Sequence, residues 1–561
     1  MRIIFSLPVL MLLLCLNCTS AIGAENDGQA DLDQATELKL NAKSLADYEK
    51  VIKLCESALE KGLNEDLAAY AKQLMVGALW QRAEQLHASM REPGLRGRLP
   101  AIREMAVKDL DKLLTLDDKA VDAHLLRARL QAYPGGNRSE AIKSIDKAIE
   151  LLAEDNKKRS DALILRAGLQ QDQERCLADL TAALEADPTN VTAWQARAEY
   201  FAGQNQLDKS ADDFEKLLER DPKNLAVREA LCKALLALKK LDLALEQANK
   251  SIEIAPESAA VHVLRAQVYE ETSDQNKEEQ KLAESDAHQK KALADLDRAV
   301  ELSAKDSATL AASLFMRARL YFLQDNLTAA RADVDRLLLR VRPDMIGGIL
   351  LRSMISAAQG RFQDAIADVQ KLLAQDRDNL ELQLQLSSLY VADKRPRKAI
   401  GLLSELIQKD KENWMALRAR ADALLSVGKH AEAIQDYNVA VRLKSDDDGI
   451  LNNFAWVLAT SPDEKLRDGR RAVELATKAC EVTQYKKPHI LSTLAAAHAE
   501  TGDFETAIKW STEAVKLGRD ELPDQLEQLE KELESYKRHE PMRELQNIEE
   551  KPDPPRNIIE T

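Results

Sequence analysis

The sequence is poor in aromatic residues, glycine and proline, and each scarcity narrows the range of possible folds. Phe, Trp and Tyr make up 4% of the 561 residues, and there are only 19 glycines and 16 prolines. Leu, Ala, Glu, Lys, Gln and Arg dominate instead, which is typical of a long helical protein and leaves little room for a β-sheet. The formal net charge of −15 argues against nucleic acid as a partner, because binding a phosphate backbone needs a basic surface.

Signatures of catalysis and cofactor binding are missing as well. The chain has no phosphate-binding glycine loop, no dinucleotide fingerprint, no HExxH or other close pair of histidines, and no GxSxG motif. Its many carboxylate pairs are typical of solvated helix faces in a chain that is 31% charged. We therefore expect a protein that is not an enzyme and that holds no cofactor and no metal.

Cysteine is scarce too, and the cysteines are not spaced like metal ligands. Four of them follow residue 24, at Cys55, Cys176, Cys232 and Cys480. We expect buried thiols here, rather than disulfides or a metal site.

The first 24 residues have the pattern of a secretory signal peptide. Arg2 precedes an apolar run over 3–16, which is too short to span a membrane comfortably, and small residues follow up to Ala24. We expect an exported protein without a transmembrane helix after cleavage. A lipid anchor at Cys18 is the alternative, but it is not favoured, because Asn17 stands where lipoprotein signals carry a small residue.

A repeated unit organises the chain from Val191 to Ser258. Pro188, Pro222 and Pro256 lie 34 residues apart, and each closes a helical pattern. Within a unit, apolar residues at i, i+4 and i+7 predict two amphipathic helices, and the proline ends the second one. One such pair cannot bury its apolar face alone, so the period predicts a stack of helical hairpins.

The register of this unit extends over most of the chain. Small residues recur where two helices must cross closely, as at Ala198 and Ser210, and they mark 12 legible units. The expected organisation is a signal peptide over 1–24, a degenerate helical pair over 25–65, the repeat array over 66–518, a capping helix over 519–540 and a disordered tail over 541–561.

Two segments depart from the regular unit. An insert over 271–291 consists almost wholly of Glu, Lys, Gln, Ser and Asp, which predicts an overlong solvated hairpin or, alternatively, a docking element. Near the end, one apolar stripe is typical of a helix that caps a stack, and a coiled-coil seam is the alternative. The stripe consists of Leu522, Leu526, Leu529, Leu533 and Tyr536.

The spacing, the small sites and the terminal proline resemble the tetratricopeptide repeat (TPR) family. The resemblance covers nearly the whole chain after residue 24. It implies an all-α superhelix whose first helices line a concave groove that receives peptides or helices of partner proteins. The family's basic carboxylate clamp is not found, and its asparagine ladder is represented only by Asn452 and Asn453. The stretches 451–483 and 491–510 resemble repeats of exported bacterial TPR proteins of unassigned role.

Nine first-helix residues are expected to face the groove. Their chemistry is mixed, as in a binding surface, although a plain solvent-facing wall would look similar. They are Arg129, Glu199, Lys233, Gln267, Arg319, Arg418, Asp422, Asn452 and Trp456.

An Arg before the first small site and an Asp after the second occur together in seven units and are absent together in four. Residues that come and go together within one chain are expected to touch. We therefore predict an ion pair between the two helices of each such unit, or between neighbouring units. The pairs are Arg82 with Asp109, Arg166 with Asp179, Arg197 with Asp213, Arg265 with Asp295, Arg317 with Asp333, Arg352 with Asp368, and Arg420 with Asp436.

The sequence thus predicts a non-catalytic scaffold or adaptor of the bacterial cell envelope or periplasm, which binds other proteins through an extended groove. The alternative is a dedicated non-catalytic subunit or assembly factor of an envelope enzyme or secretion complex, with one stable partner instead of many weak ones.

Overall fold

The computed structural model describes residues 27–303, 307–544 and 550–551, and every secondary-structure element in these ranges is helical. Consecutive helices pair into thirteen hairpins, and one further helix follows the last of them. The all-α expectation is therefore confirmed. The expected signal peptide, with Cys18, lies outside the described residues. Contacts divide the chain into two units, 1–255 and 256–561.

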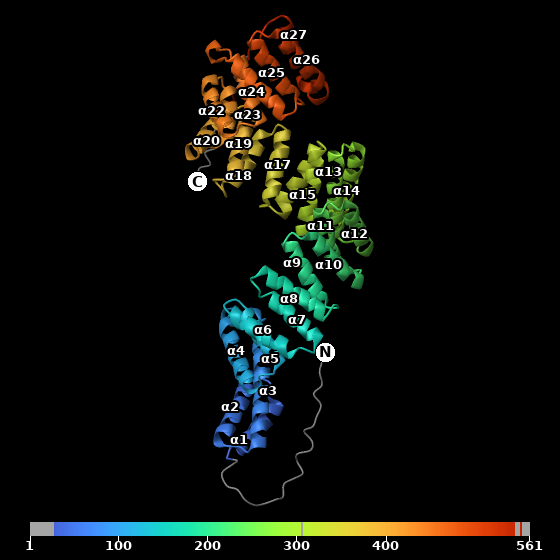
Figure 1. The fold of residues 1–561 in the computed structure, drawn as a ribbon, viewed down its shortest axis with the longest axis vertical. Helices are drawn as coiled ribbons and strands as arrows, with labels where there is room; N and C mark the ends of the chain where they lie inside the picture. Colours follow the sequence, from blue (N-terminus) through green and yellow to red (C-terminus); the bar gives the residue numbers. More distant parts are fainter. Residues whose placement is uncertain (1–26, 304–306, 545–549, 552–561) are drawn as a thin grey trace, which may run out of the picture. The chain divides into compact units, whose positions relative to one another are not determined.

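The first unit consists of six hairpins, each made of two helices that follow one another in the chain (Figure 1). Its helices are α1 (Gln29–Asn41), α2 (Leu45–Lys61), α3 (Glu65–Ser89), α4 (Leu99–Leu116), α5 (Val121–Ala132), α6 (Arg138–Leu151), α7 (Asn156–Ala167), α8 (Gln173–Ala186), α9 (Val191–Gly203), α10 (Leu207–Arg220), α11 (Leu225–Ala237) and α12 (Leu241–Ile254), with the short 3-10 helix η1 (Pro93–Arg98) before α4.

The second unit continues with seven hairpins and the final helix. Its helices are α13 (Ala259–Glu278), α14 (Leu282–Leu302), α15 (Ser307–Leu323), α16 (Leu327–Arg336), η2 (Leu337–Val341), α17 (Ile346–Ala358), α18 (Phe362–Leu373), α19 (Leu380–Ala392), α20 (Pro396–Lys409), α21 (Trp414–Leu425), α22 (His430–Leu443), α23 (Asp448–Thr460), η3 (Glu464–Leu466), α24 (Gly469–Val482), α25 (Pro488–Glu500), α26 (Phe504–Glu521), η4 (Pro523–Gln525) and α27 (Leu526–Lys537).

The repeated prolines lie in the turns that separate one hairpin from the next. Pro188 and Pro222 each stand two residues beyond the end of a second helix. The chain then restarts on asparagine, and the side chains of Asn190 and Asn224 accept hydrogen bonds from backbone amides in the first turns of α9 and α11. Proline cannot continue a helix and asparagine is a good N-cap, so the two residue types fix where each hairpin ends and the next begins.

The small residues lie at the helix crossings and have no solvent exposure. The hydroxyl of Ser210 donates a hydrogen bond to the carbonyl oxygen of Ala198 at 2.8 Å, and the thiol of Cys232 donates to that of Ala244 at 3.4 Å. A side-chain donor reaches a carbonyl of the facing helix only where the backbones cross closely. The register of small residues therefore sets the spacing within each hairpin.

The insert over 271–291 lengthens one hairpin at its tip. Helices α13 and α14 contain 20 and 21 residues, more than the other hairpins of the second unit. The buried hydroxyl oxygens of Ser273 and Ser285 lie 2.8 Å apart, and Asn276 Nδ2 lies 3.1 Å from His288 Nδ1. Polar pairs thus join the two helices of the extension, and its use as a docking element stays a prediction.

Helix α27 packs on the last hairpins through four residues of the apolar stripe, from Leu526 to Tyr536, whereas Leu522 precedes the helix and α26 extends to Glu521. Leu529 and Tyr536 are buried in the same core cluster as residues of α25 and α26. The carboxylate of Glu532 is buried beside them, where it accepts hydrogen bonds from Ser492 Oγ at 2.5 Å and from Gln528 Nε2 at 3.0 Å. Burial raises the pKa of Glu532 above its ordinary value.

The described residues of the tail, 541–544 and 550–551, contact the second unit and so differ from the disorder expected over 541–561. Arg543 forms an ion pair with Glu500 at 2.7 Å. The backbone amide of Lys551 donates to the carbonyl oxygen of Lys394 at 2.9 Å. Backbone and ionic contacts of this kind are not visible in composition, which was the basis for expecting disorder.

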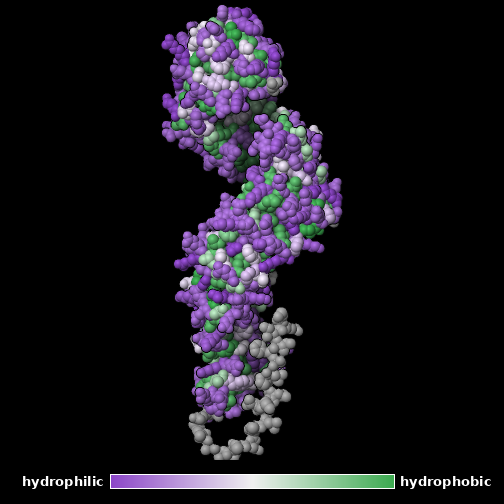
Figure 2. All heavy atoms as spheres, turned by 45° about the vertical axis from the view of Figure 1, so that its right-hand side comes forward, coloured by the Kyte–Doolittle hydropathy of each residue, from purple (hydrophilic) through white to green (hydrophobic). Residues whose placement is uncertain are grey.

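Figure 2 shows a largely hydrophilic face, interrupted by hydrophobic patches. Of the helices that the structure describes, none combines the length and the apolar character needed to cross a bilayer.

Candidate functional site

Each of the seven predicted Arg–Asp pairs lies together, across the two helices of one hairpin. In every pair, two guanidinium nitrogens donate to the two carboxylate oxygens of the Asp. At Arg317, for example, Nε and Nη2 lie 2.7 Å from Asp333 Oδ2 and Oδ1. The hydrogen bond to Asp333 is the main reason why the pKa of Arg317 is raised. These pairs are part of the architecture, although Arg82 and Asp109 also line a hollow of about 620 Å³.

Four first-helix arginines also reach an Asp of the preceding hairpin, a contact that the sequence analysis missed. Arg317 Nη1 lies 2.7 Å from Asp297 Oδ1, and Arg166 Nη1 lies 2.7 Å from Asp146 Oδ1. The others are Arg127 with Asp111 at 2.6 Å and Arg352 with Asp335 at 3.6 Å. The sequence signal for this contact is a second acidic residue two positions after the Asp of the predicted pair, as Asp335 follows Asp333.

The unit of Arg127 lacks the second-helix Asp, and the structure shows what replaces it. Ser144 stands at that position and accepts a hydrogen bond from Arg127 Nη1 at 2.6 Å. Glu140 adds an ion pair at 3.2 Å. The guanidinium is therefore satisfied without the missing carboxylate.

The nine groove candidates do not form one site. In the first unit, Arg129, Glu199 and Lys233 lie on α5, α9 and α11, and no hydrogen bond or ion pair joins them in the described part of the chain. Lys233 is paired with Glu229 at 2.5 Å. In the second unit, Arg319 pairs across α13 and α15 with Glu270 at 2.7 Å. Gln267 Nε2 lies 4.0 Å from the sulfur of Met316, also on α15.

The structure brings three of the candidates together in a polar network of α21 to α23. Asp422 accepts hydrogen bonds from the hydroxyl of the buried Tyr437 and from Asn453 Nδ2, the latter at 2.9 Å. Arg418 Nη1 lies 2.9 Å from Asp447 Oδ1. Asn452 donates to Asn453 at 3.0 Å, and Trp456 packs on the core next to it. Most of these groups are satisfied within the network, which joins two successive hairpins, but Asn452 Oδ1 is buried without a hydrogen-bond partner among the described residues.

A hollow of about 830 Å³ lies over the first helices α3 and α5, which contact each other directly. We call it the α3–α5 hollow. The apolar side chains of Trp80 and Leu126 line it together with polar and charged residues. Its charged lining consists of Glu84 and His87 on α3, Arg91 in the turn after α3, and Asp122 and Arg129 on α5.

The charges of the α3–α5 hollow are sorted by sign. Glu84 and Asp122 form an acidic pair, and Arg91 and Arg129 form a basic pair. Burial, and then the charge of Asp122, raise the pKa of Glu84. Burial, and then the charges of Arg91 and Arg129, lower the pKa of His87. Among the described residues, none of the four charged groups forms an ion pair.

A second hollow, of about 420 Å³, adjoins the first at the basic pair. The two hollows share His87, Arg91 and Arg129, and the second continues over Tyr133 and Leu165 toward α7. No carboxylate lines this second hollow. The basic pair thus lies in the middle of a longer depression, with the acidic pair at one side.

Of the charged residues in the α3–α5 hollow, only Arg129 was predicted from the sequence to face the groove. Glu84 follows the small residue Ala83 just as Arg129 follows Ala128, so the same position in the repeat predicts that Glu84 faces the groove. Arg91 lies in the irregular turn between α3 and α4. Its position beside Arg129 depends on how that turn folds back.

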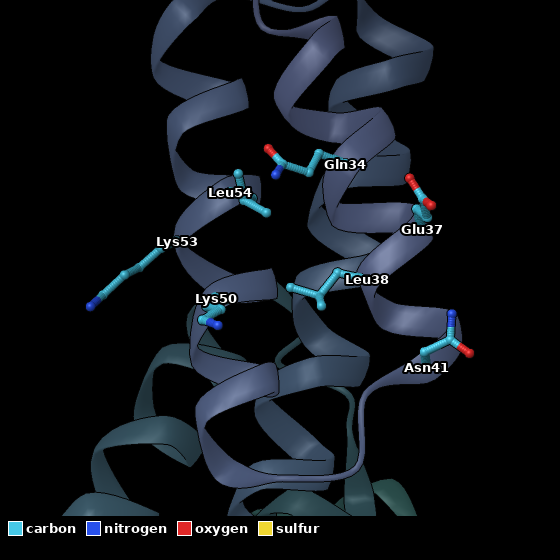
Figure 3. Close-up of a pocket in the computed structure, with 7 residues that line it drawn as sticks. All are labelled: Gln34, Glu37, Leu38, Asn41, Lys50, Lys53 and Leu54. Carbon is cyan, nitrogen blue, oxygen red and sulfur yellow. The ribbon is translucent and has the colours of Figure 1, made fainter.

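Another hollow, of about 610 Å³, lies between α1 and α2 (Figure 3). Leu38 and Leu54 point into the space between the two helices, while Asn41 and Lys53 point away from it. Gln34 also points into this space, but a single amide among apolar side chains does little to orient a ligand.

The four described cysteines are free thiols. Burial raises the pKa of Cys55 to about 11 and the pKa values of Cys232 and Cys480 to about 12. These thiols stay protonated at neutral pH. No group of three His, Cys, Asp or Glu side chains suited to a metal ion occurs within 27–303, 307–544 and 550–551.

Three regions of the chain match family models described as tetratricopeptide repeat. They cover residues 170–224, 201–268 and 356–422. The match includes the hairpins around the repeated prolines, where the packing of small residues was described above. These regions of the chain are tetratricopeptide repeats.

Individual proteins are similar to this chain either over a short stretch or at low sequence identity. DnaJ homolog subfamily C member 3 of Bos taurus is 30% identical over 96 residues, which are 16% of this chain and 19% of that protein. The chain thus spans about a fifth of the length of this curated relative. Among solved structures, yeast Tom70 has a TM-score of 0.40 at 16% identity, over 83% of this chain and 96% of that one. A tetratricopeptide repeat protein from Parabacteroides merdae has a TM-score of 0.34 at 15% identity, over 47% and 97%.

Proposed function

We propose that this protein is a non-catalytic scaffold or adaptor of the bacterial cell envelope, and that it binds segments of partner proteins over its first helices. TPR arrays are protein-interaction scaffolds, which gives the general role. The observation that carries the proposal for this chain is the α3–α5 hollow, an open depression on first helices whose two carboxylates and two guanidinium groups form no ion pair among the described residues.

Several first helices also contact each other directly. In the first unit α3 contacts α5 and α7 contacts α9, and in the second unit α13, α15 and α17 contact in succession. Within these groups, a partner segment that lies on one first helix can continue onto the next. The envelope location rests on the sequence pattern of residues 1–24.

The proposal is tested by site-specific photocrosslinking in cells that produce the full chain. A photoreactive amino acid is placed at Ala88 or Glu199, which are exposed on the first helices α3 and α9, and at Asp212, which is exposed on the second helix α10. Crosslinked proteins are identified by mass spectrometry. We expect partner proteins at the first two positions and none at Asp212.

Each outcome has a defined meaning. Several envelope proteins at low yield support a scaffold, and one dominant envelope protein supports the alternative, a dedicated subunit or assembly factor. Equal crosslinking at all three positions would contradict binding over the first helices. Cytosolic partners alone would contradict the envelope location.

A further inference from the structure

We propose that the α3–α5 hollow binds an extended peptide segment in which a basic and an acidic side chain stand three residues apart. The inference rests on the proposed function and names the chemistry of the segment that this hollow takes. It depends on how the acidic pair and the basic pair are arranged on two neighbouring helices.

The separation of the two pairs is set by α5. Asp122 and Arg129 are seven residues apart within this helix, which is two turns, a rise of about 10 Å. Glu84 on α3 completes the acidic pair, and Arg91 in the turn after α3 completes the basic pair. The acidic pair and the basic pair are therefore about 10 Å apart along α5, with Trp80 and Leu126 lining the hollow.

Neither pair is neutralised within the protein. Two carboxylates lie together at one end and two guanidinium groups at the other, and none of them forms an ion pair among the described residues. Like charges held close to each other are unfavourable until an opposite charge joins them. In most hairpins the fold supplies that opposite charge, as Asp333 does for Arg317. Here a ligand has to supply it.

The width of the hollow favours an extended chain over a helix. Helices in direct contact, as α3 and α5 are, have axes about 8–10 Å apart, while a helix with its side chains is about 10–12 Å across. A helix is therefore too wide to sink between them, and an extended chain is not. In the polyproline II conformation an extended chain has three residues per turn and rises about 3.1 Å per residue, so its side chains three residues apart lie on the same side, about 9 Å apart. Its basic side chain then meets the acidic pair and its acidic side chain meets the basic pair.

The test uses selection from a displayed library of random 12-residue peptides on the purified protein. Wild-type protein should enrich peptides with Lys or Arg three positions from Asp or Glu. R91Q/R129Q should lose the enrichment of acidic residues and keep that of basic ones, and E84Q/D122N should do the reverse. The control R175Q/K223Q removes two exposed positive charges outside the hollow and should select like the wild type.

Binding of one enriched peptide is then measured by fluorescence polarisation. We expect each hollow variant to weaken binding about tenfold at low salt, and less at high salt, since the pairs are open to solvent. Enrichment of a helical or uncharged consensus, no enrichment at all, or identical selection by all variants would overturn the inference. The proposed function fails separately, because it predicts crosslinks at Glu199 that do not depend on this hollow.

Discussion

The ion pair between Arg317 and Asp333 allows a quantitative test of how the hairpins are held together. Its side chains are 15% and 9% exposed, and two parallel hydrogen bonds join them. Removing one partner from a buried pair costs about 3–5 kcal/mol, and partial exposure reduces this to about 2–3 kcal/mol here. We therefore expect R317L and D333L each to destabilise the hairpin of α15 and α16 by about 2 kcal/mol.

The double variant R317L/D333L should be much less harmful than the sum of the two single changes. Leu386 and Leu402 occupy the equivalent positions in the hairpin of α19 and α20. An apolar pair therefore already replaces the ion pair in another hairpin of this chain. Burying two leucines in place of a semi-buried ion pair is close to neutral. The coupling energy of the double-mutant cycle should then be at least about 1 kcal/mol.

The assay is native-state hydrogen exchange of the amides in α15 and α16. Long repeat arrays do not unfold in one step, so a single global unfolding energy is not a safe measure, whereas local opening energies are. The matched control is D297N, which removes the outer carboxylate that is 52% exposed and should cost less than about 0.5 kcal/mol. Additive effects of R317L and D333L would refute the reasoning.

Three further predictions concern other parts of the array. In the native protein lacking residues 1–24, Cys55, Cys232 and Cys480 should resist a thiol reagent, because burial keeps these thiols protonated and inaccessible. The same reagent should label all four cysteines after denaturation, and rapid labelling of all four in the native state would contradict the prediction. E532Q should stabilise the C-terminal cap by on the order of 1 kcal/mol at pH 7 in exchange measurements. The raised pKa of Glu532 means that its cost is absent below about pH 4.5 and grows as the pH rises through the folded-state pKa, so the gain should vanish in acid, and a pH-independent gain would exclude this cause. A455L should lower the local unfolding free energy of the hairpin of α23 and α24 by about 1–3 kcal/mol, because Ala455 is fully buried at the helix crossing. An unchanged exchange rate would show that the two helices do not cross closely there.

The sequence was sufficient for the hairpins and for the pairing of side chains that repeats in register. A period of 34 residues and the recurring small residues depend only on local spacing, and the seven Arg–Asp contacts could be inferred because the residues vary together. The contact of Arg317 with Asp297 was missed because it joins two hairpins, whose relative placement depends on the turn between them. The α3–α5 hollow was missed for a related reason, since Arg91 comes from an irregular turn.

Burial of single polar groups was also beyond the sequence. Glu532 reads as part of the charged face of the last helix, and only packing against α25 places it beside Ser492. The tail contacts of Arg543 and Lys551 likewise depend on which surfaces of the array the chain passes. In both cases a charged residue contacts a specific neighbour that the local sequence pattern does not predict.

The arginines that reach two carboxylates have a mechanical consequence. Arg127 and Arg166 tie three successive hairpins of the first unit, α3 to α8, and Arg317 and Arg352 tie three of the second, α13 to α18. When the chain is stretched from its ends, separating two tied hairpins breaks a partly exposed ion pair in addition to the apolar contacts. Each tie adds less than about 0.5 kcal/mol, so the tied hairpins should separate at a slightly higher force than hairpins without a tie, and high salt should remove the difference.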